Sequence, residues 1–178
     1  MNWASICENP VLANLPYKIQ TDKWGNIVMS PATNRHGIYQ AKIVALLSRI
    51  MDTGTVITEC SVETSEGTKV ADVAWASSRF IQINQDMTPF IAAPELCVEI
   101  ISPSNSVAEM DEKKALYFAR GCEEFWLCDS EGNMKFYKNT GELEHSLIFD
   151  EFPDTRCSSF YSLTFRNTNK SGYSRHCA

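Results

Sequence analysis

Residues 94–121 read PELCVEIISPSNSVAEMDEKKALYFARG, and this stretch decides the fold class. Its first part, PELCVEIISPS (94–104), holds the run LCVEII, which is apolar on both faces apart from Glu99. Such a run, ended by Ser102-Pro103, predicts a strand in the middle of a covered sheet. The second part, VAEMDEKKALYFARG (107–121), predicts a helix, because acidic residues occupy its early turns and a glycine follows its last turn.

The sequence on either side of this pair predicts one more helix and several more strands. Helical spacing of apolar residues indicates a helix in ATNRHGIYQAKIVALLSRIMD (32–52), capped by Thr33 or Asn34. A loop with one helical turn is expected in SSRFIQINQDMTPF (77–90). Apolar segments between turn residues predict the strands: 17–19 and 27–29 as a hairpin around DKWGN, then 55–63, 69–76, 123–129, 134–139 and 141–149.

This order of elements predicts one mixed α/β domain, with a central mixed β-sheet flanked by helices. We assign the domain to residues 1–166, with 1–15 as an N-terminal arm and 167–178 as a polar C-terminal tail. A chain of 178 residues with 44% hydrophobic residues has about the size of one domain and enough apolar side chains for a core.

The chain is acidic, with 16 Lys and Arg residues against 22 Asp and Glu residues and a formal net charge of -6. A protein that coats nucleic acid by bulk electrostatics should be basic, so the charge excludes a tight, nonspecific coat on DNA. Contact with nucleic acid would then need a metal ion or a local basic edge. Lys113, Lys114 and Arg35 are the candidates for such an edge.

The cysteines and the termini indicate a cytoplasmic protein. The seven cysteines are odd in number and form no CxxC pair, and Cys97 and Cys128 lie in apolar segments. This placement favours reduced, structural cysteines over a disulfide framework or a zinc site. No stretch approaches the ~20 apolar residues of a membrane helix, and the N-terminus lacks the pattern of a secretory signal.

Two acidic residues lie in strands where a charge is costly. Asp72 stands between two Val-Ala pairs, and Glu99 stands between Cys-Val and Ile-Ile. If the two strands are neighbours with these faces aligned, the carboxylates form a site of hard oxygen ligands that suits Mg²⁺ or Mn²⁺. Alternatively, each acid lies at a strand end and caps a backbone group or pairs with a lysine. We favour the alternative for either acid alone and the cation site for the pair.

Lys113 is the third candidate, one strand-to-helix connection after Glu99. Near the start of a helix that packs on the sheet, it can point to the strand end and hold a water there. The alternative is a solvated surface lysine. His36 and Gln40, four residues apart near the start of the first helix, are candidates to line one edge of the site. A structural hydrogen-bonding role is the alternative for His36.

The motifs around these residues resemble the Uma-two family, whose inferred activity is that of restriction endonucleases of the PD-(D/E)XK superfamily. The resemblance runs from about Tyr17 to Phe149. It rests on MSPATNRHGIYQAKIVALL, on Asp72, and then on EIISPS, EKKALY and GCEEFWLCD. The family implies a restriction-endonuclease-like fold and Mg²⁺-dependent phosphodiester hydrolysis.

Carried over by this resemblance, Asp72 looks like the acid of the "PD" element, Glu99 like the second acid, and Lys113 like the lysine on the following helix. Ala71 stands where the pattern has proline, which shapes the backbone and binds no metal. Ile101 stands where the wider superfamily has lysine, so Lys113 would have to replace it.

The leading hypothesis is a Mg²⁺-dependent endonuclease, with Mn²⁺ as a substitute metal and DNA favoured over RNA. Asp72, Glu99 and the backbone carbonyl of Ile100 would hold the metal, and Lys113 would orient a water. MKFYKN (134–139) and SLIF (146–149) are expected to be sheet-edge strands that need covering or pairing. A homodimer is therefore expected, and its two subunits could engage both strands of a duplex. The alternatives are a catalytically inactive binding or assembly module on the same fold, and a structural protein with two satisfied acids. Convergence of the Asp72, Glu99 and Lys113 side-chain tips would favour the nuclease.

Overall fold

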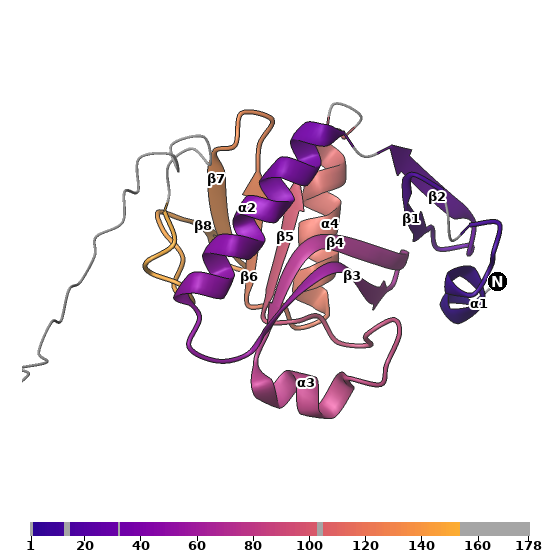
Figure 1. Cartoon of the computed structure of the whole chain (residues 1–178), viewed down its shortest axis with the longest axis horizontal. Coiled ribbons are helices and arrows are strands. Elements are labelled where there is room, and N and C mark those ends of the chain that lie inside the picture. The colour runs from indigo at the N-terminus through magenta and orange to yellow at the C-terminus, as the bar shows by residue number, and fades with distance from the viewer. Residues whose placement is uncertain (1, 13–14, 32, 103–104, 154–178) are drawn as a thin grey trace, which may run out of the picture.

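The described part of the structure, a computed structural model, comprises residues 2–12, 15–31, 33–102 and 105–153. It holds four helices and eight strands (Figure 1). In chain order they are α1 (Trp3–Cys7), β1 (Tyr17–Thr21), β2 (Ile27–Pro31), α2 (Asn34–Ile50), β3 (Thr55–Thr64), β4 (Gly67–Ala76), α3 (Ser78–Asn84), β5 (Leu96–Ile100), α4 (Val107–Ala119), β6 (Glu124–Cys128), β7 (Met134–Lys138) and β8 (Gly141–Leu143).

Strands β3 to β8 form one six-stranded sheet in sequential order. Only the β5–β6 pair within this sheet is parallel, and the other pairs are antiparallel. Helix α2 lies across one face and α4 lies behind the other, as Figure 1 shows. The predicted mixed α/β fold, with a central mixed sheet flanked by helices, is therefore confirmed.

The β5–α4–β6 unit forms as the sequence of its two halves predicts. All five residues of β5 are buried, as a strand covered on both faces requires. Helix α4 begins after Ser106, whose hydroxyl accepts the backbone N–H of Glu109, and it ends before Gly121, whose φ of +95° few other residues adopt. Because α4 crosses back over the sheet, β6 can pair parallel to β5.

The two helices cover different halves of the core. Ile43 and Leu47 of α2 pack with Val73 and Val98 on one face of the sheet, and all four side chains are inaccessible to solvent. On the other face, Tyr117 of α4 packs against the strands. Helix α2 is capped by Thr33, one of the two predicted capping residues, whose hydroxyl accepts the backbone N–H of His36.

Strands β1 and β2 form a separate antiparallel hairpin that packs against β4. Two side chains of β1 tie the hairpin to β4: Gln20 accepts the N–H of Val70 at 3.3 Å, and Thr21 accepts the N–H of Thr68 at 2.8 Å. In Figure 1 the hairpin and α1 lie beyond the end of the sheet where a turn joins β3 to β4. The hairpin thus adds a wall beside the sheet rather than another strand to it.

Several predicted elements differ from the observed ones. The predicted strand 141–149 is a strand only at β8, since the carboxylate of buried Glu124 accepts the N–H groups of Leu147 and Ile148 at 2.6 and 3.0 Å. Those groups cannot also pair with a strand. MKFYKN was expected near a sheet edge, but β7 lies between β6 and β8.

Two short helices and the C-terminal boundary are the remaining points of comparison with the prediction. The expected N-terminal arm contains the short helix α1, and the single helical turn expected in 77–90 is the seven-residue helix α3. The domain boundary at residue 166 and the polar tail predicted for 167–178 lie outside the described residues.

The five cysteines in the described ranges, Cys7, Cys60, Cys97, Cys122 and Cys128, are all free. Four of them are buried, as expected for structural residues. Burial raises the pKa of the Cys60 thiol to about 12, which keeps it protonated and unreactive at neutral pH. Of the helices in these ranges, none combines the length and the apolar character needed to cross a membrane.

Gly67, the first residue of β4, offers a test of how the β1–β2 hairpin is docked. Its φ is +89°, and a Cβ there would lie 2.5 Å from the carbonyl oxygen of Thr21 and would also overlap the carbonyl oxygen of Asp22. We expect Gly67→Ala to lower the free energy of unfolding by about 2–4 kcal/mol, because backbone strain and overlap add. Urea unfolding would measure the change.

Gly121→Ala is the matched control. Gly121 also has a positive φ, but a Cβ there meets no atom within 4 Å. This variant should therefore lose only the strain contribution, about 1–2 kcal/mol. Equal losses in the two variants would contradict the tight docking of the hairpin at Gly67.

Candidate active site

The site lies where the β4–β5 ladder ends. The last pair toward the site is Val73 with Val98, and one step further in this register Asp72 stands opposite Glu99. Beyond Val98, a side chain replaces the backbone of β4 as hydrogen-bond partner of β5: Asp72 Oδ2 accepts the N–H of Ile100 at 2.7 Å. Asp72 is 0% exposed and Glu99 is 2% exposed. The sheet thus places two buried carboxylates side by side, as the alternation of each strand predicted.

Helix α4 supplies two donors to Glu99. Lys113 Nζ lies 3.1 Å from Glu99 Oε2, and the Tyr117 hydroxyl donates to Oε1 at 2.9 Å. Lys113 and Tyr117 are four residues apart and so share one face of the helix. Lys113 is 5% exposed, which excludes the alternative of a solvated surface lysine.

The hairpin supplies a second lysine, which sequence reasoning missed. Lys18 of β1 forms an ion pair with Asp72 Oδ1, and its Nζ lies 3.4 Å from Glu99 Oε2. Its side chain is 12% exposed. The ammonium therefore bridges the two carboxylates. Nothing local in YKIQT signals this role, because it depends on where the hairpin docks.

Helix α2 completes the wall beside Asp72. His36 Nε2 lies 3.2 Å from Asp72 Oδ1, and Gln40 Nε2 donates to the backbone carbonyl of Asp72 at 2.8 Å. Both residues, which the sequence offered as candidates, therefore contact Asp72. Gln40 also donates to Glu59 Oε1 at 2.8 Å, which brings a third carboxylate to the site.

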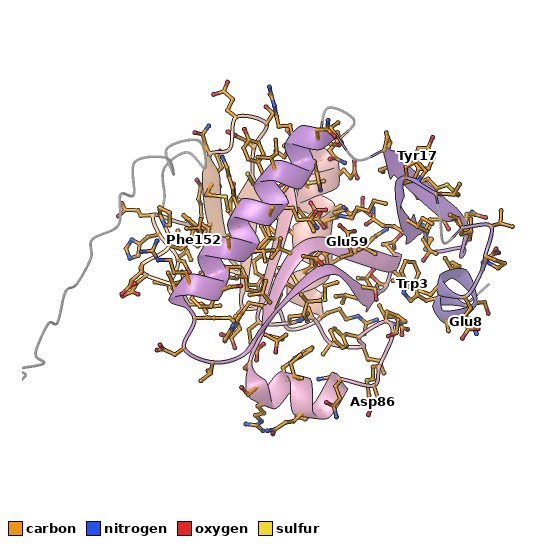
Figure 2. The ribbon with its side chains drawn as sticks, in the orientation of Figure 1. Trp3, Glu8, Tyr17, Glu59, Asp86 and Phe152 are labelled. Atoms are coloured by element: carbon orange, nitrogen blue, oxygen red, sulfur yellow. The ribbon has the colours of Figure 1, made fainter. Side chains whose placement is uncertain are left out.

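Glu59 is a further residue that the sequence did not reveal. It lies in β3 opposite Asp72, at the one position where the β3–β4 pairing is broken although the register continues on both sides, and it has a φ of +52°. Such a backbone conformation is unusual for a non-glycine residue. In Figure 2 Glu59 lies at the centre of the molecule, on the side of β3 that faces α2. Its exposed carboxylate reaches the site from the strand itself.

The charges in this group shift one another's pKa values. Burial raises the pKa of Asp72, but the charge and hydrogen bonds of Lys18 and His36 outweigh it and lower the pKa to about 2. Burial opposes the charge on Lys18, yet Glu99 and Asp72 raise its pKa above the usual value. Burial and the charge of Glu99 raise the pKa of Tyr117. At neutral pH Asp72 is thus an anion, Lys18 a cation and Tyr117 a neutral donor.

These side chains open onto a cavity of about 350 Å³. Its lining includes every predicted site residue together with the two that were missed: Lys18, His36, Gln40, Glu59, Asp72, Glu99, Ile100 and Lys113. A cavity of this volume is large enough to bind a small molecule or a nucleotide. The acids are therefore reachable from one side, although their oxygens are buried.

The expected basic edge does not form as predicted. Lys113 points into the site, whereas Lys114 pairs with Asp111 at 2.7 Å and lies over the Tyr137 ring at 4.4 Å. The two lysines therefore face different environments although they are adjacent in the chain. Arg35 donates to the backbone carbonyl of Ser130 at 3.2 Å, at the start of α2.

The donor set fits a small divalent cation. Asp72 and Glu99 already direct one carboxylate oxygen each to a single cationic group, the Lys18 ammonium. Within the described ranges, no three His, Cys, Asp or Glu side chains group in a way that could hold a metal ion. Mg²⁺ nevertheless suits a site of one or two carboxylates, since it keeps several waters and takes other ligands from the substrate.

The fold and the buried acids define a nuclease-like α/β protein. The chain belongs to the Uma2 family, described as "Putative restriction endonuclease", which matches residues 24–154. A crystal structure from Anabaena variabilis ATCC 29413, described as "a putative nuclease belonging to DUF820", is similar to it, with a TM-score of 0.56 and 19% identity over 64% of this chain and 68% of that chain. No curated protein matches the chain. The family resemblance and the fold class drawn from the sequence are confirmed.

The pairing of His36 with Asp72 predicts a pH-dependent contribution to stability. The hydrogen bond to Asp72 raises the pKa of His36, against the effect of burial. Its stabilisation is then full below the ordinary value of about 6.5 and is lost as the pH rises through the raised folded-state value. We expect His36→Asn to lower the free energy of unfolding more at pH 6 than at pH 9, in urea titrations with a chelator present.

His145→Asn is the control for this prediction, because His145 is exposed and lies outside the site. A surface substitution away from any structural contact changes the free energy of unfolding little, so the effect of His145→Asn should be small. If the loss caused by His36→Asn were the same at both pH values, His36 would not be charged in its contact with Asp72.

Proposed function

We propose that this chain is a Mg²⁺-dependent endonuclease that hydrolyses phosphodiester bonds in DNA, with Mn²⁺ as a substitute metal. One observation carries the proposal: buried carboxylates from adjacent strands converge on one cation, with Lys113 at 3.1 Å from one of them. The description of the Uma2 family supports the same reaction class, and its word "restriction" favours DNA.

In this proposal Asp72, Glu99 and the carbonyl of Ile100 hold the metal. The bound ion would supply Lewis-acid activation of a water and charge stabilisation at a phosphate oxygen. The N–H of Ile100 fixes one oxygen of Asp72, and Tyr117 fixes one oxygen of Glu99. The remaining oxygen of each acid is thereby oriented toward the same point before any ligand binds.

Lys113 is the proposed positioning and charge-stabilising residue. Its ammonium touches Glu99 and lines the cavity, so it can reach a phosphate or a water next to the acids. Positive charge fixed in a buried site stabilises developing negative charge more than it would in water. Lys113 would thus compensate for Ile101, which stands where the superfamily has its lysine.

We also propose a cytoplasmic homodimer. The five free cysteines of the described ranges are consistent with a reducing compartment. A dimer would present two sites to the two strands of a duplex. The sheet ends at β8, a strand of three residues, and short edge strands limit uncontrolled pairing. Light scattering tests the oligomeric state, and a monomer at working concentration would count against the dimer.

Cleavage assays on DNA with Mg²⁺ or Mn²⁺ test the proposed reaction. We expect Asp72→Asn and Glu99→Gln to lower the cleavage rate by at least about 100-fold, because each removes one carboxylate charge from the metal site. Lys113→Met should lower the rate by about 10²-fold or more. Glu66→Gln is the control, since Glu66 is an acid outside the cavity lining and pairs with Lys23 at 3.7 Å.

Parallel assays on RNA test the substrate preference, and circular dichroism checks that each variant is folded. If the folded wild-type protein cuts neither DNA nor RNA with either metal, the proposal is wrong. Activity retained by Asp72→Asn and Glu99→Gln would show that cleavage comes from a contaminant or from another site.

A second candidate function is the catalytically inactive binding or assembly module. The observation that favours it is Lys18, whose ammonium already occupies the position between the two acids. In that case the ion pairs would be structural and the cavity would bind a ligand without cleaving it. This candidate expects no Mn²⁺ binding in calorimetric titration, whereas the nuclease expects binding that Asp72→Asn weakens.

A further inference from the structure

We infer that Lys18 is an internal cation that competes with the divalent metal for Asp72 and Glu99, so that metal binding requires the Lys18 ammonium to leave them. The inference rests on the proposed function and adds a built-in control of its metal site. Because Lys18 belongs to β1, the β1–β2 hairpin would then contribute to control of metal binding by keeping an ammonium group on the two carboxylates.

The atoms that Lys18 contacts are those that a metal would need. Asp72 Oδ2 accepts the N–H of Ile100, and Glu99 Oε1 accepts the hydroxyl of Tyr117. The oxygens left to face the cavity are Asp72 Oδ1 and Glu99 Oε2, and the Lys18 ammonium touches both. A metal that binds these two oxygens would therefore occupy the position of the Lys18 Nζ.

The charge balance points the same way. The two buried carboxylates are matched by the two ammonium groups of Lys18 and Lys113. At the edge of the site the exposed carboxylate of Glu59 adds negative charge, and His36 adds positive charge when protonated. A divalent ion added to this buried group would leave a large uncompensated positive charge. Withdrawal of Lys18 removes one positive charge and its contact with both oxygens. Among the described residues, Asp72 Oδ1 then keeps only His36 as a partner, and Glu99 Oε2 keeps only Lys113. Metal binding and Lys18 release are therefore coupled.

The surroundings can accept the released side chain. Lys18 lines the same 350 Å³ cavity as Glu59, whose carboxylate adds to the rise in the pKa of Lys18. A lysine carries its charge on a flexible four-carbon stem, so its ammonium can turn into the cavity while the strand stays in place. Gln20 and Thr21 hold β1 on β4, and their hydrogen bonds do not involve the Lys18 side chain.

Calorimetric titration of the full chain with MnCl₂ tests the competition. Lys18→Met should bind Mn²⁺ at least about tenfold more tightly than the wild type, because the competitor is removed. Lys23→Met is the matched control: Lys23 belongs to the same hairpin but pairs with Glu66, and its removal should leave the affinity unchanged. Without metal, Lys18→Met should also melt at a lower temperature, and Mn²⁺ should raise that temperature more than in the wild type.

A second measurement keeps the test independent of whether Lys18→Met folds. Acetylation of the wild-type protein with an amine reagent, followed by mass spectrometry, reports the accessibility of Lys18. Saturating Mn²⁺ should accelerate acetylation of Lys18 several-fold and leave that of exposed Lys23 unchanged. Ca²⁺ at the same ionic strength tests whether a larger divalent ion also displaces the lysine.

Two results would overturn the inference while leaving the proposed function in place: equal Mn²⁺ affinities of wild type and Lys18→Met, or a Lys18 acetylation rate that ignores the metal although Mn²⁺ binds. If neither protein binds Mn²⁺ and the wild type cleaves no nucleic acid, the proposed function fails and the inference falls with it. Tighter binding by Lys18→Met, with faster acetylation in the wild type, supports the inference.

Discussion

The burial of two carboxylates in the sheet is the constraint on which the arrangement of the surrounding helix and hairpin depends. An unpaired buried carboxylate is very costly, so Asp72 and Glu99 require cations and hydrogen-bond donors within reach. The elements around the β4–β5 ladder end supply them: α4 brings Lys113, β1 brings Lys18, and Ile100 provides a backbone N–H. The helix α4 and the β1–β2 hairpin thus both supply cations to the same two buried carboxylates. The lysines that do so, Lys18 and Lys113, also line the cavity.

Buried acids in this sheet have different kinds of partners, as Glu124 shows. Glu124 is 2% exposed, the same as Glu99, and it too lies in a strand. Its carboxylate accepts hydrogen bonds from neutral donors: the Trp126 indole, the Ser146 hydroxyl and the backbone of the segment that follows. These neutral donors fix the segment that follows β8. The pair at Asp72 and Glu99 differs in that its partners include two lysine ammonium groups and in that both acids line a cavity.

The features that could be predicted from the sequence are those that depend on neighbouring residues in the chain. The apolar run around Glu99 and the helix that follows it gave the β5–α4 unit, and charges within apolar strands identified both acids before their register was known. Lys18 could not be found in this way, because its role arises from the docking of a separate hairpin on β4. The position of Glu59 depends on an unusual backbone conformation where one β3–β4 pair is missing. The segment after β8 escaped prediction because a distant side chain, Glu124, takes its N–H groups.

The bridge formed by Lys18 also has a consequence for folding. It joins residues 54 and 81 positions apart in the chain, whereas β3 and β4 pair across a tight turn. Contacts between nearby residues close small loops and form first, and contacts across long loops carry a larger entropic cost. We therefore expect the sheet to form before the ion pairs, with the hairpin docking late. A chain caught midway would hold two acids without the Lys18 ammonium, and its cavity would lack the residues that the hairpin contributes until folding had finished.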